Sequence, residues 1–387
     1  MSARMHTDWP MLMAILLILA FGLVMVVSAS STVPKMLNHM AQWEPERSWD
    51  LAKKQFVAAI IGLIALFAIR WFGYLRLQHP LYVFLPVNLV AIALIGVALI
   101  DPKHRWYHIF GIQLQPSELA KPILILFVAW FVARREDKLN DRYTFLPVLL
   151  VVGGLSALIA YGDLGTALVI LVPAAAVFYV AGIDRKYFRF TILIGFLLFA
   201  GFLIHKPYRI IRLTSFIGLT EERIQTDPRL HWLARLLERT GAERDAGYHA
   251  LQAKLAVGSG GALGVGLGQS KQKLGFLPEP HTDFILGVIG EEWGLAGCIV
   301  LLGAYFLIFW RGLRLYWLAP DPFGRYLALG CVALFTAQAF FNMSVVLGLA
   351  PTKGLPLPLI SYGGSSVFCM LLTLGLLMSV GDRATAT

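Results

Sequence analysis

Residues 11–27 read MLMAILLILAFGLVMVV, an uninterrupted apolar run without a charged side chain. An α-helix rises 1.5 Å per residue, so about 17–25 apolar residues are needed to cross the hydrocarbon core of a bilayer. The run follows a short polar start and ends at Ser28, Ala29 and Ser30, in the manner of a secretory signal. Since many further apolar runs follow, we predict an uncleaved first membrane helix.

The same pattern continues along the whole chain. Nine further runs are long enough to cross a membrane, and the short gap between the fifth and sixth predicts a tight helical hairpin. The predicted spans are 11–28, 53–71, 80–100, 117–133, 145–161, 163–181, 187–205, 284–310, 324–348 and 357–380. We therefore expect an all-α polytopic membrane protein, a bundle of about ten transmembrane helices that forms a single domain over 1–387. One long loop, 206–283, separates the seventh and eighth spans.

The composition excludes other classes of protein. Of the 387 residues, 58% are hydrophobic and only 14% are charged, with a mean hydropathy of +0.69. Soluble domains are roughly half apolar and a quarter charged, and disordered chains are still more polar, so both classes are excluded. Cys298, Cys331 and Cys369 lie inside apolar runs, which favours buried thiols over disulfides or a metal site.

The formal net charge of +10 is best explained by basic loops between membrane helices. No soluble domain is expected that could carry a basic face, so we predict no nucleic acid partner. With the N-terminus inside, lysine and arginine concentrate in the segments predicted to be cytoplasmic, such as 134–142 and 185–189. Both termini are therefore expected in the cytoplasm, and the loop 206–283 is expected outside.

This long loop contains a glycine-rich stretch, 258–268, with the sequence GSGGALGVGLG. It lacks the Gly-Lys-Ser/Thr ending of a nucleotide-binding loop and no strand is predicted before it, which excludes ATP binding there. Two interpretations remain: a flexible turn, or a backbone nest for a pyrophosphate group.

Several ionisable residues fall where apolar surroundings make them costly. Glu118 and Lys121 open the fourth span, three residues apart and therefore on one face of the helix. They either form a structural ion pair or line a water-filled cavity.

Two further polar pairs lie deeper in the predicted helices. Glu291 and Glu292 are about 12 Å into the eighth span by the helix rise, which implies a hydrated interior, an inward partner or a proton path. Gln338 and Asn342 are four residues apart in the ninth span, which predicts hydrogen bonds between helices.

A carboxylate lies at the outer start of the eighth span, in LPEPHTDF (277–284). Thr282 or Asp283 suits the N-cap of this helix, where a side-chain oxygen accepts orphan backbone N–H groups. Alternatively Asp283, next to His281 and beneath the glycine-rich stretch, is placed to act as a general base.

Other polar residues are expected at the same outer rim. Asp163 suits the N-cap of the sixth span. The tenth span begins in a stretch broken by proline and glycine, which is tolerated only against protein or a cavity. Arg105, Lys121 and Lys353 all fall on the outer side, where they either snorkel to the interface or meet an anionic headgroup.

Six motifs then occur in order across nearly the whole chain. They are QPSELAK (115–121), DLGT (163–166), AGYH (246–249), FLPEPHTDF (276–284), GEEWG (290–294) and PLPLISYGG (356–364). Together they closely resemble the SEDS family, named for shape, elongation, division and sporulation. PTKG (351–354) and QKL (272–274) resemble its cell-division members more than its elongation members.

The resemblance implies a ten-span peptidoglycan glycosyltransferase that polymerises lipid II at the outer face of the bacterial cytoplasmic (inner) membrane, in cell division. It implies a class B penicillin-binding protein as the partner that cross-links the new strand, along with other division proteins and membrane lipid. Asp283 matches the essential acid of the family and is implied to be the general base. The residues implied to bind substrate are Arg105, Glu118, Lys121, Asp163, His281, Lys353, Ser361 and Gly363.

The implied chemistry needs one base. A sugar hydroxyl attacks the carbon that carries an axial pyrophosphate from the opposite face, so inversion proceeds without a covalent enzyme intermediate. Pyrophosphate leaves readily, and cations near it are stabilising; we assign that role to Arg105, Lys121 and Lys353. A divalent cation, Mg2+ or Mn2+, stays an open option because the sequence shows no ligand cluster.

Two other functions remain open. A transporter (flippase) that moves lipid II across the membrane would use the deep acids Glu291 and Glu292 and would depend on an energy gradient. A non-catalytic division scaffold would tolerate the loss of Asp283.

Overall fold

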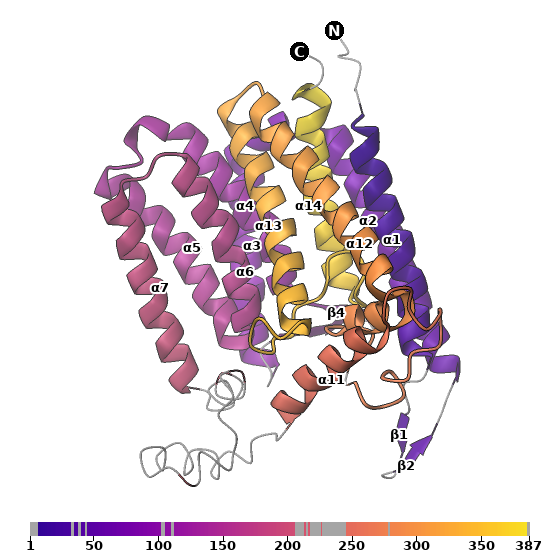
Figure 1. The fold of residues 1–387 in the computed structure, drawn as a ribbon. Coiled ribbons are helices and arrows are strands. Elements are labelled where there is room, and N and C mark those ends of the chain that lie inside the picture. Colours follow the sequence, from indigo (N-terminus) through magenta and orange to yellow (C-terminus); the bar gives the residue numbers. More distant parts are fainter. Residues whose placement is uncertain are drawn as a thin grey trace.

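The computed structural model describes residues 7–31, 35–37, 40–42, 45–101, 105–109, 112–205, 213, 216, 226, 245–277 and 279–384 (Figure 1). A long helix lies at each of the ten predicted spans. These helices are α1 (Trp9–Ser30), α2 (Pro45–Phe72), α3 (Pro80–Ile100), α4 (Pro116–Arg134), α5 (Arg142–Gly162), α6 (Leu164–Val180), α7 (Arg185–His205), α12 (Ile285–Leu318), α13 (Pro322–Val346) and α14 (Gly364–Ala384). Within the described part, eight helices are long and apolar enough to span a membrane; α6, with 17 residues, is shorter.

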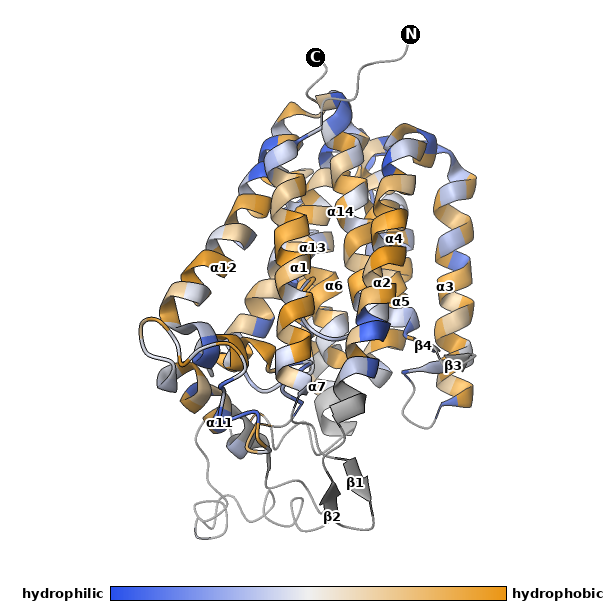
Figure 2. Ribbon diagram, turned by 90° about the vertical axis from the view of Figure 1, so that its right-hand side faces the viewer, coloured by the Kyte–Doolittle hydropathy of each residue, from blue (hydrophilic) through white to orange (hydrophobic). Residues whose placement is uncertain are grey.

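The helices stand side by side, and α1 begins at the same end of the bundle where α14 ends (Figure 1). Figure 2 shows a broad band of hydrophobic residues along the helices, with hydrophilic residues gathered at that end. A bilayer requires such a band of helices whose backbone groups are paired internally. The chain is therefore a multi-pass membrane protein, and the start of α1 and the end of α14 lie on one side of it. That this side is the cytoplasm remains a prediction.

Shorter elements lie in the segments that connect the long helices. Two antiparallel hairpins are formed by β1 (Lys35–Leu37) with β2 (Met40–Gln42) and by β3 (Tyr107–Ile109) with β4 (Ile112–Leu114). Two 3-10 turns, η1 (Tyr74–Gln78) and η2 (Glu136–Lys138), follow α2 and α4, and α11 (Asp245–Ser259) packs against α12. Most of the predicted loop 206–283 before Asp245 lies outside the described residues.

The centre of the bundle is formed by α4, α13 and α14. In their most apolar stretches 78%, 67% and 78% of the residues are buried, against 22% in α12 and 28% in α2 and α3. The outer helices therefore present apolar side chains to their surroundings, as lipid permits and water does not. Four buried polar residues discussed below, Glu118, Lys121, Gln338 and Asn342, lie on the central helices α4 and α13, where they need partners.

Several predicted boundaries are wrong. Helix α2 begins at Pro45, earlier than the predicted 53. Helix α12 continues to Leu318 and carries a break at Gly294, whose φ of +64° favours glycine. The predicted span 357–380 forms a helix only from Gly364, and 351–363 is irregular. Hydropathy alone extended this span, because prolines and apolar residues alternate in the irregular segment.

Candidate functional site at the outer rim

Asp283 lies in a turn directly before α12, at the end of the bundle opposite the termini. The N-cap of α12 is Phe284, which has no side-chain acceptor, so neither Thr282 nor Asp283 occupies the predicted N-cap position. The Asp283 side chain is half-buried and lies against Gly354: a Cβ atom at Gly354 would be 2.8 Å from Asp283 Oδ2. A glycine at position 354 is therefore what lets the carboxylate approach this segment.

Asn342 of α13 fixes the backbone on both sides of this contact. Its Nδ2 donates to the carbonyl oxygen of Asp283 at 2.8 Å and to that of Leu355 at 2.6 Å. Because Asn342 is 1% exposed, no water competes for these bonds, which are stronger than they would be at the surface. A single buried amide thus joins the turn that carries Asp283 to the segment 351–363.

Gln338, one helical turn earlier in α13, extends this arrangement to α4. Its Nε2 donates to the carbonyl oxygen of Pro356 at 2.9 Å, and its Oε1 accepts from Lys121 Nζ at 2.8 Å. Lys121 in turn pairs with Glu118 at 2.6 Å. We call Glu118, Lys121, Gln338 and Asn342, with the carbonyls they bind, the rim network.

The contacts of the rim network show which of the roles predicted for its residues are correct. The ion pair of Glu118 and Lys121 is confirmed, and the side chains are 3% and 1% exposed. The alternative, a charged wall on a water-filled cavity, is therefore wrong for these two. Gln338 does bond between helices as predicted, whereas both bonds of Asn342 go to loop carbonyls.

The irregular segment 351–363 is bonded to the turn before α12 as well. Ser361 Oγ donates to the carbonyl of Thr282 at 2.6 Å, and the Tyr362 N–H donates to the carbonyl of His281 at 2.8 Å. Ser361 is 1% exposed, which makes it a positioning residue in this structure. Its predicted contact with substrate, like that of Gly363, stays a prediction.

Gln55 of α2 is a residue that sequence reasoning missed. Its amide donates to the carbonyl of Ser361 at 3.1 Å and accepts from the Gly363 N–H at 3.0 Å, so it holds the end of the irregular segment. A single glutamine at the start of an apolar run gives no signal of this role. The role becomes visible only in the structure, because the partner Ser361 is more than 300 positions away in the sequence.

Arg105 and Asp163 meet on the same rim, as their predicted positions require. Arg105 donates from Nε to the carbonyl of Gly162 at 2.8 Å, and its guanidinium lies 3.9 Å from the Asp163 carboxylate. Asp163 caps α6 by accepting from the Thr166 N–H at 3.2 Å, which confirms the predicted cap. The Arg105 side chain is 38% exposed and so is accessible from outside.

Lys353 and His281 complete the predicted set. Lys353 is half-buried and directly precedes Gly354, the neighbour of the Asp283 carboxylate. His281 is two residues before Asp283, with its Nε2 3.8 Å from the Glu279 carboxylate and its ring against Tyr362. Both residues therefore lie on the segments that frame Asp283.

The deep acids Glu291 and Glu292 have inward partners. Glu292 accepts from Ser28 Oγ of α1 at 2.7 and 2.8 Å and from Lys273 Nζ at 2.8 Å. Glu291 accepts from the backbone N–H groups of Lys271 and Gln272 at 2.8 and 3.2 Å. Of the three interpretations, the inward partner is confirmed, because both carboxylates hold the stretch that follows the glycine-rich loop.

The glycine-rich stretch 258–268 also has a structural partner. It lies against α12 at the break, so close that a Cβ atom at Gly294 would be 2.3 Å from the Gly264 nitrogen. The N–H groups of Val265 and Gly266 donate to the carbonyls of Glu291 and Glu292, at 3.0 Å each. These donors are used within the chain, so the predicted backbone nest for pyrophosphate is wrong at these two residues, and the stretch is no free turn.

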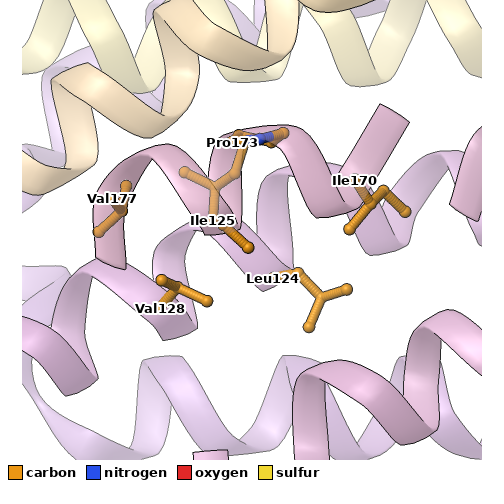
Figure 3. Close-up of a pocket in the computed structure, with 7 residues that line it drawn as sticks. Leu124, Ile125, Val128, Ile170, Pro173 and Val177 are labelled. Carbon is orange, nitrogen blue, oxygen red and sulfur yellow. The ribbon is translucent and has the colours of Figure 1, made fainter. Parts of the chain in front are cut away.

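Two apolar cavities lie beside α6. The small one, between α4 and α6, is lined by Leu124, Ile125, Val128, Ile170, Pro173, Ala174 and Val177 (Figure 3). Without a polar atom on its walls it is no site for water or an ion. The larger one, of about 240 Å³, lies between α5, α6 and α7 and reaches Leu164, directly after Asp163.

In the described part of the chain, no three His, Cys, Asp or Glu side chains gather in a group that could hold a metal. Cys331 and Cys369 are buried and Cys298 is partly buried, and all three are free thiols, as predicted.

The sequence model of the FtsW, RodA and SpoVE proteins, described as cell cycle protein, matches residues 8–386. The chain belongs to this family. It is 36% identical to the probable peptidoglycan glycosyltransferase FtsW of Geobacter sp. (strain M18), over 97% of each chain. It is 34% identical to the stage V sporulation protein E of Bacillus subtilis (strain 168), over 98% of each chain. The predicted family is confirmed.

Solved structures agree with this membership. One similar chain belongs to a peptidoglycan synthase complex studied for the structural coordination of polymerization and crosslinking, with a TM-score of 0.70, 25% identity and 98% of each chain covered. Another is the rod shape determining protein RodA of Thermus thermophilus, with a TM-score of 0.64 and 27% identity over 98% of this chain and 97% of that one. The fold class predicted from the sequence is confirmed.

Proposed function

We propose that this chain polymerises the glycan strands of peptidoglycan from lipid II, during cell division, at the outer face of the bacterial cytoplasmic membrane. The names of its relatives support the reaction class. The observation that carries the proposal is the placement of Asp283: it directly precedes the N-cap of α12, and its side chain lies half-buried on the rim beside Gly354. The rim network holds the backbone on both sides of it.

In the proposed reaction Asp283 is the general base. A hydroxyl of the acceptor sugar gives its proton to a carboxylate oxygen of Asp283, while its oxygen forms the new bond to the donor's anomeric carbon. The bond from that carbon to the pyrophosphate oxygen breaks on the opposite face, and the lipid pyrophosphate leaves with the electron pair. One inversion results, and a second carboxylic acid is not required.

The leaving pyrophosphate is anionic, and Arg105 and Lys353 are the accessible cations we assign to it. Lys121, which is buried, acts through Gln338 instead. A divalent cation such as Mg2+ or Mn2+ is still proposed, but the described residues show no ligand group for it. Polymerisation with and without a chelator tests it.

The lipid tail of the substrate fits the larger apolar cavity between α5, α6 and α7. This cavity reaches Leu164, next to the pair of Asp163 and Arg105, so a chain lying there has its charged end near a cation.

The structure does not support the observation on which the transporter alternative was based. That alternative relied on Glu291 and Glu292 as free acids in a hydrated interior, but both are bonded to neighbouring segments. A class B penicillin-binding protein and other division proteins remain proposed partners, supported by the likeness to a chain of a peptidoglycan synthase complex.

The test is glycan synthesis by the purified full chain in detergent, with labelled lipid II and the partner transpeptidase. We expect glycan ladders from the native protein and none from Asp283→Ala. Asp50→Asn, an exposed acid on α2, is the matched control and should make ladders. Normal ladders from a folded Asp283→Ala variant contradict the base assignment. No ladders from the folded native protein would favour the scaffold alternative.

A further inference from the structure

The loop 258–268 exposes apolar side chains in a place where water would not favour them. Leu263 is 83% exposed, Leu267 51% and Val265 45%. Such residues usually need a partner when they gather on one loop. The depth of the loop in the membrane identifies that partner.

The depth of the loop can be estimated from the length of α1. Its start and its end are each bonded to α12: Asp8 pairs with Arg311 at 2.8 Å, and Ser28 bonds to Glu292 at 2.7 Å. The apolar run of α1 lies between these two contacts, and its twenty or so residues rise about 30 Å, the thickness of a hydrocarbon core. Glu292 therefore marks the outer edge of that core on α12.

The glycine-rich loop is bonded to α12 at this edge and just below it. Val265 N–H donates to the Glu291 carbonyl, while the carbonyls of Gly261 and Ala262 accept from the N–H groups of Leu295 and Ala296 at 2.9 and 3.0 Å. Because α12 runs inward from Ile285, the turn at 261–264 is about one helical turn deeper than Glu292. Leu263 stands on that deepest turn.

The neighbouring face of α12 supports the same placement. Leu295 and Val300 follow directly and are 61% and 74% exposed, as expected of side chains that face lipid. The loop backbone meets the condition for lying at this depth, since bonds to α12 use its N–H and carbonyl groups. Lys271, which is exposed, follows the loop at the level of the headgroups.

We propose that the loop 258–268 is a re-entrant segment and that Leu263, Val265 and Leu267 contact acyl chains of the outer leaflet. Its attachment through Lys273 and Glu292 then holds the chain just before Asp283 at the height of the headgroups. The proposal is independent of the reaction proposed above, because it concerns only the position of the loop.

The test uses the full chain in nanodiscs of phosphatidylethanolamine and phosphatidylglycerol, with Cys298, Cys331 and Cys369 replaced by alanine. A nitroxide label is placed on Leu263→Cys, on Val300→Cys as the lipid-facing control and on Asp50→Cys, 66% exposed, as the water-facing control. Collision rates with oxygen and with a water-soluble nickel chelate are measured by electron paramagnetic resonance.

We expect the label at Leu263 to collide more with oxygen than with nickel, as at Val300, and the label at Asp50 to show the reverse. Thermal unfolding that matches the cysteine-free parent confirms each fold, and Leu267→Cys provides a second reading. A nickel-accessible label at Leu263 and Leu267 overturns the proposal. Labels shielded from both reagents overturn it too, because they would show packing against protein.

Discussion

The two ends of the bundle are fastened in different ways. Where α1 begins, Arg70 of α2 binds Asp382 of α14 through two bonds of 2.6 Å, and Arg311 of α12 binds Asp8; we call these the inner clamp. Its contacts run from side chain to side chain between helices. The rim network instead ends on carbonyl groups of two loops, one of them that of Asp283.

This difference separates stability from function. Side-chain pairs between helices stabilise the bundle without fixing any loop. Bonds to loop carbonyls fix the backbone beside a reactive side chain, and a misplacement of about 1 Å there costs on the order of 100-fold in rate. Loss of the inner clamp should therefore affect stability alone, whereas loss of the rim network should affect stability and rate.

The largest effect is expected for Lys121→Met. It leaves Glu118 charged, buried and without its cation, which costs about 3–5 kcal/mol of unfolding free energy. Glu118 Oε2 already has no hydrogen-bond partner among the described residues, so nothing nearby compensates. Denaturant unfolding measures the loss, and glycan synthesis should fall as well. The charge swap Glu118→Lys with Lys121→Glu should restore part of the stability; native stability in the single variant would contradict the role of the pair.

Arg70→Met should destabilise the protein by about 3 kcal/mol, since Asp382 then loses a buried partner. The rate of glycan synthesis per folded molecule should not change, because the inner clamp binds no loop of the rim. Replacing both residues, Arg70→Met with Asp382→Leu, should recover much of the stability. A lower rate of glycan synthesis per folded molecule of Arg70→Met would show that the inner clamp does not affect stability alone.

Asn342→Leu tests the rim network without removing a charge. The variant frees the carbonyls of Asp283 and Leu355, so we expect glycan synthesis to fall about tenfold to 100-fold by displacement of the base. Initial rates on lipid II measure this. Ser344→Ala, a buried change two residues further along α13, is the control and should keep the native rate. Equal rates for both variants would remove Asn342 from the positioning of Asp283.

The smallest effect is expected for Arg311→Gln. The Arg311 side chain is 23% exposed, and its partner Asp8, although 3% exposed, keeps the Met11 N–H as a hydrogen-bond donor. We therefore expect a loss smaller than that of Arg70→Met, on the order of 1–2 kcal/mol. Thermal unfolding should shift by only a few degrees, with an unchanged rate of glycan synthesis. A loss as large as that of Arg70→Met would show that exposure does not rank the contacts of the inner clamp.

Hydropathy predicts the ten helices well because lipid selects for long apolar runs. It does not predict where α14 begins, because the segment 351–363 is apolar yet held in an irregular form by Gln55 and the rim network. The break at Gly294 also depends on a distant partner, the glycine-rich loop.

In the candidate site, too, local sequence predicts some features, whereas others depend on partners that are distant in the sequence. Motifs identified Asp283 and Asp163, the expected outer-side position identified Arg105, and local spacing predicted the pair of Glu118 and Lys121. The bonds of Asn342 to two loop carbonyls could not be predicted, since they depend on how α13 meets segments more than ten residues away in the sequence.

The role of Asp283 as the general base is tested most directly by the turnover of Asp283→Asn at saturating lipid II, measured together with the binding of lipid II. The amide keeps the size of the carboxylate but is no base, so we expect kcat to fall at least about 100-fold while binding stays close to native. An unchanged kcat would contradict the account, as would a loss of activity that arises entirely from weaker binding.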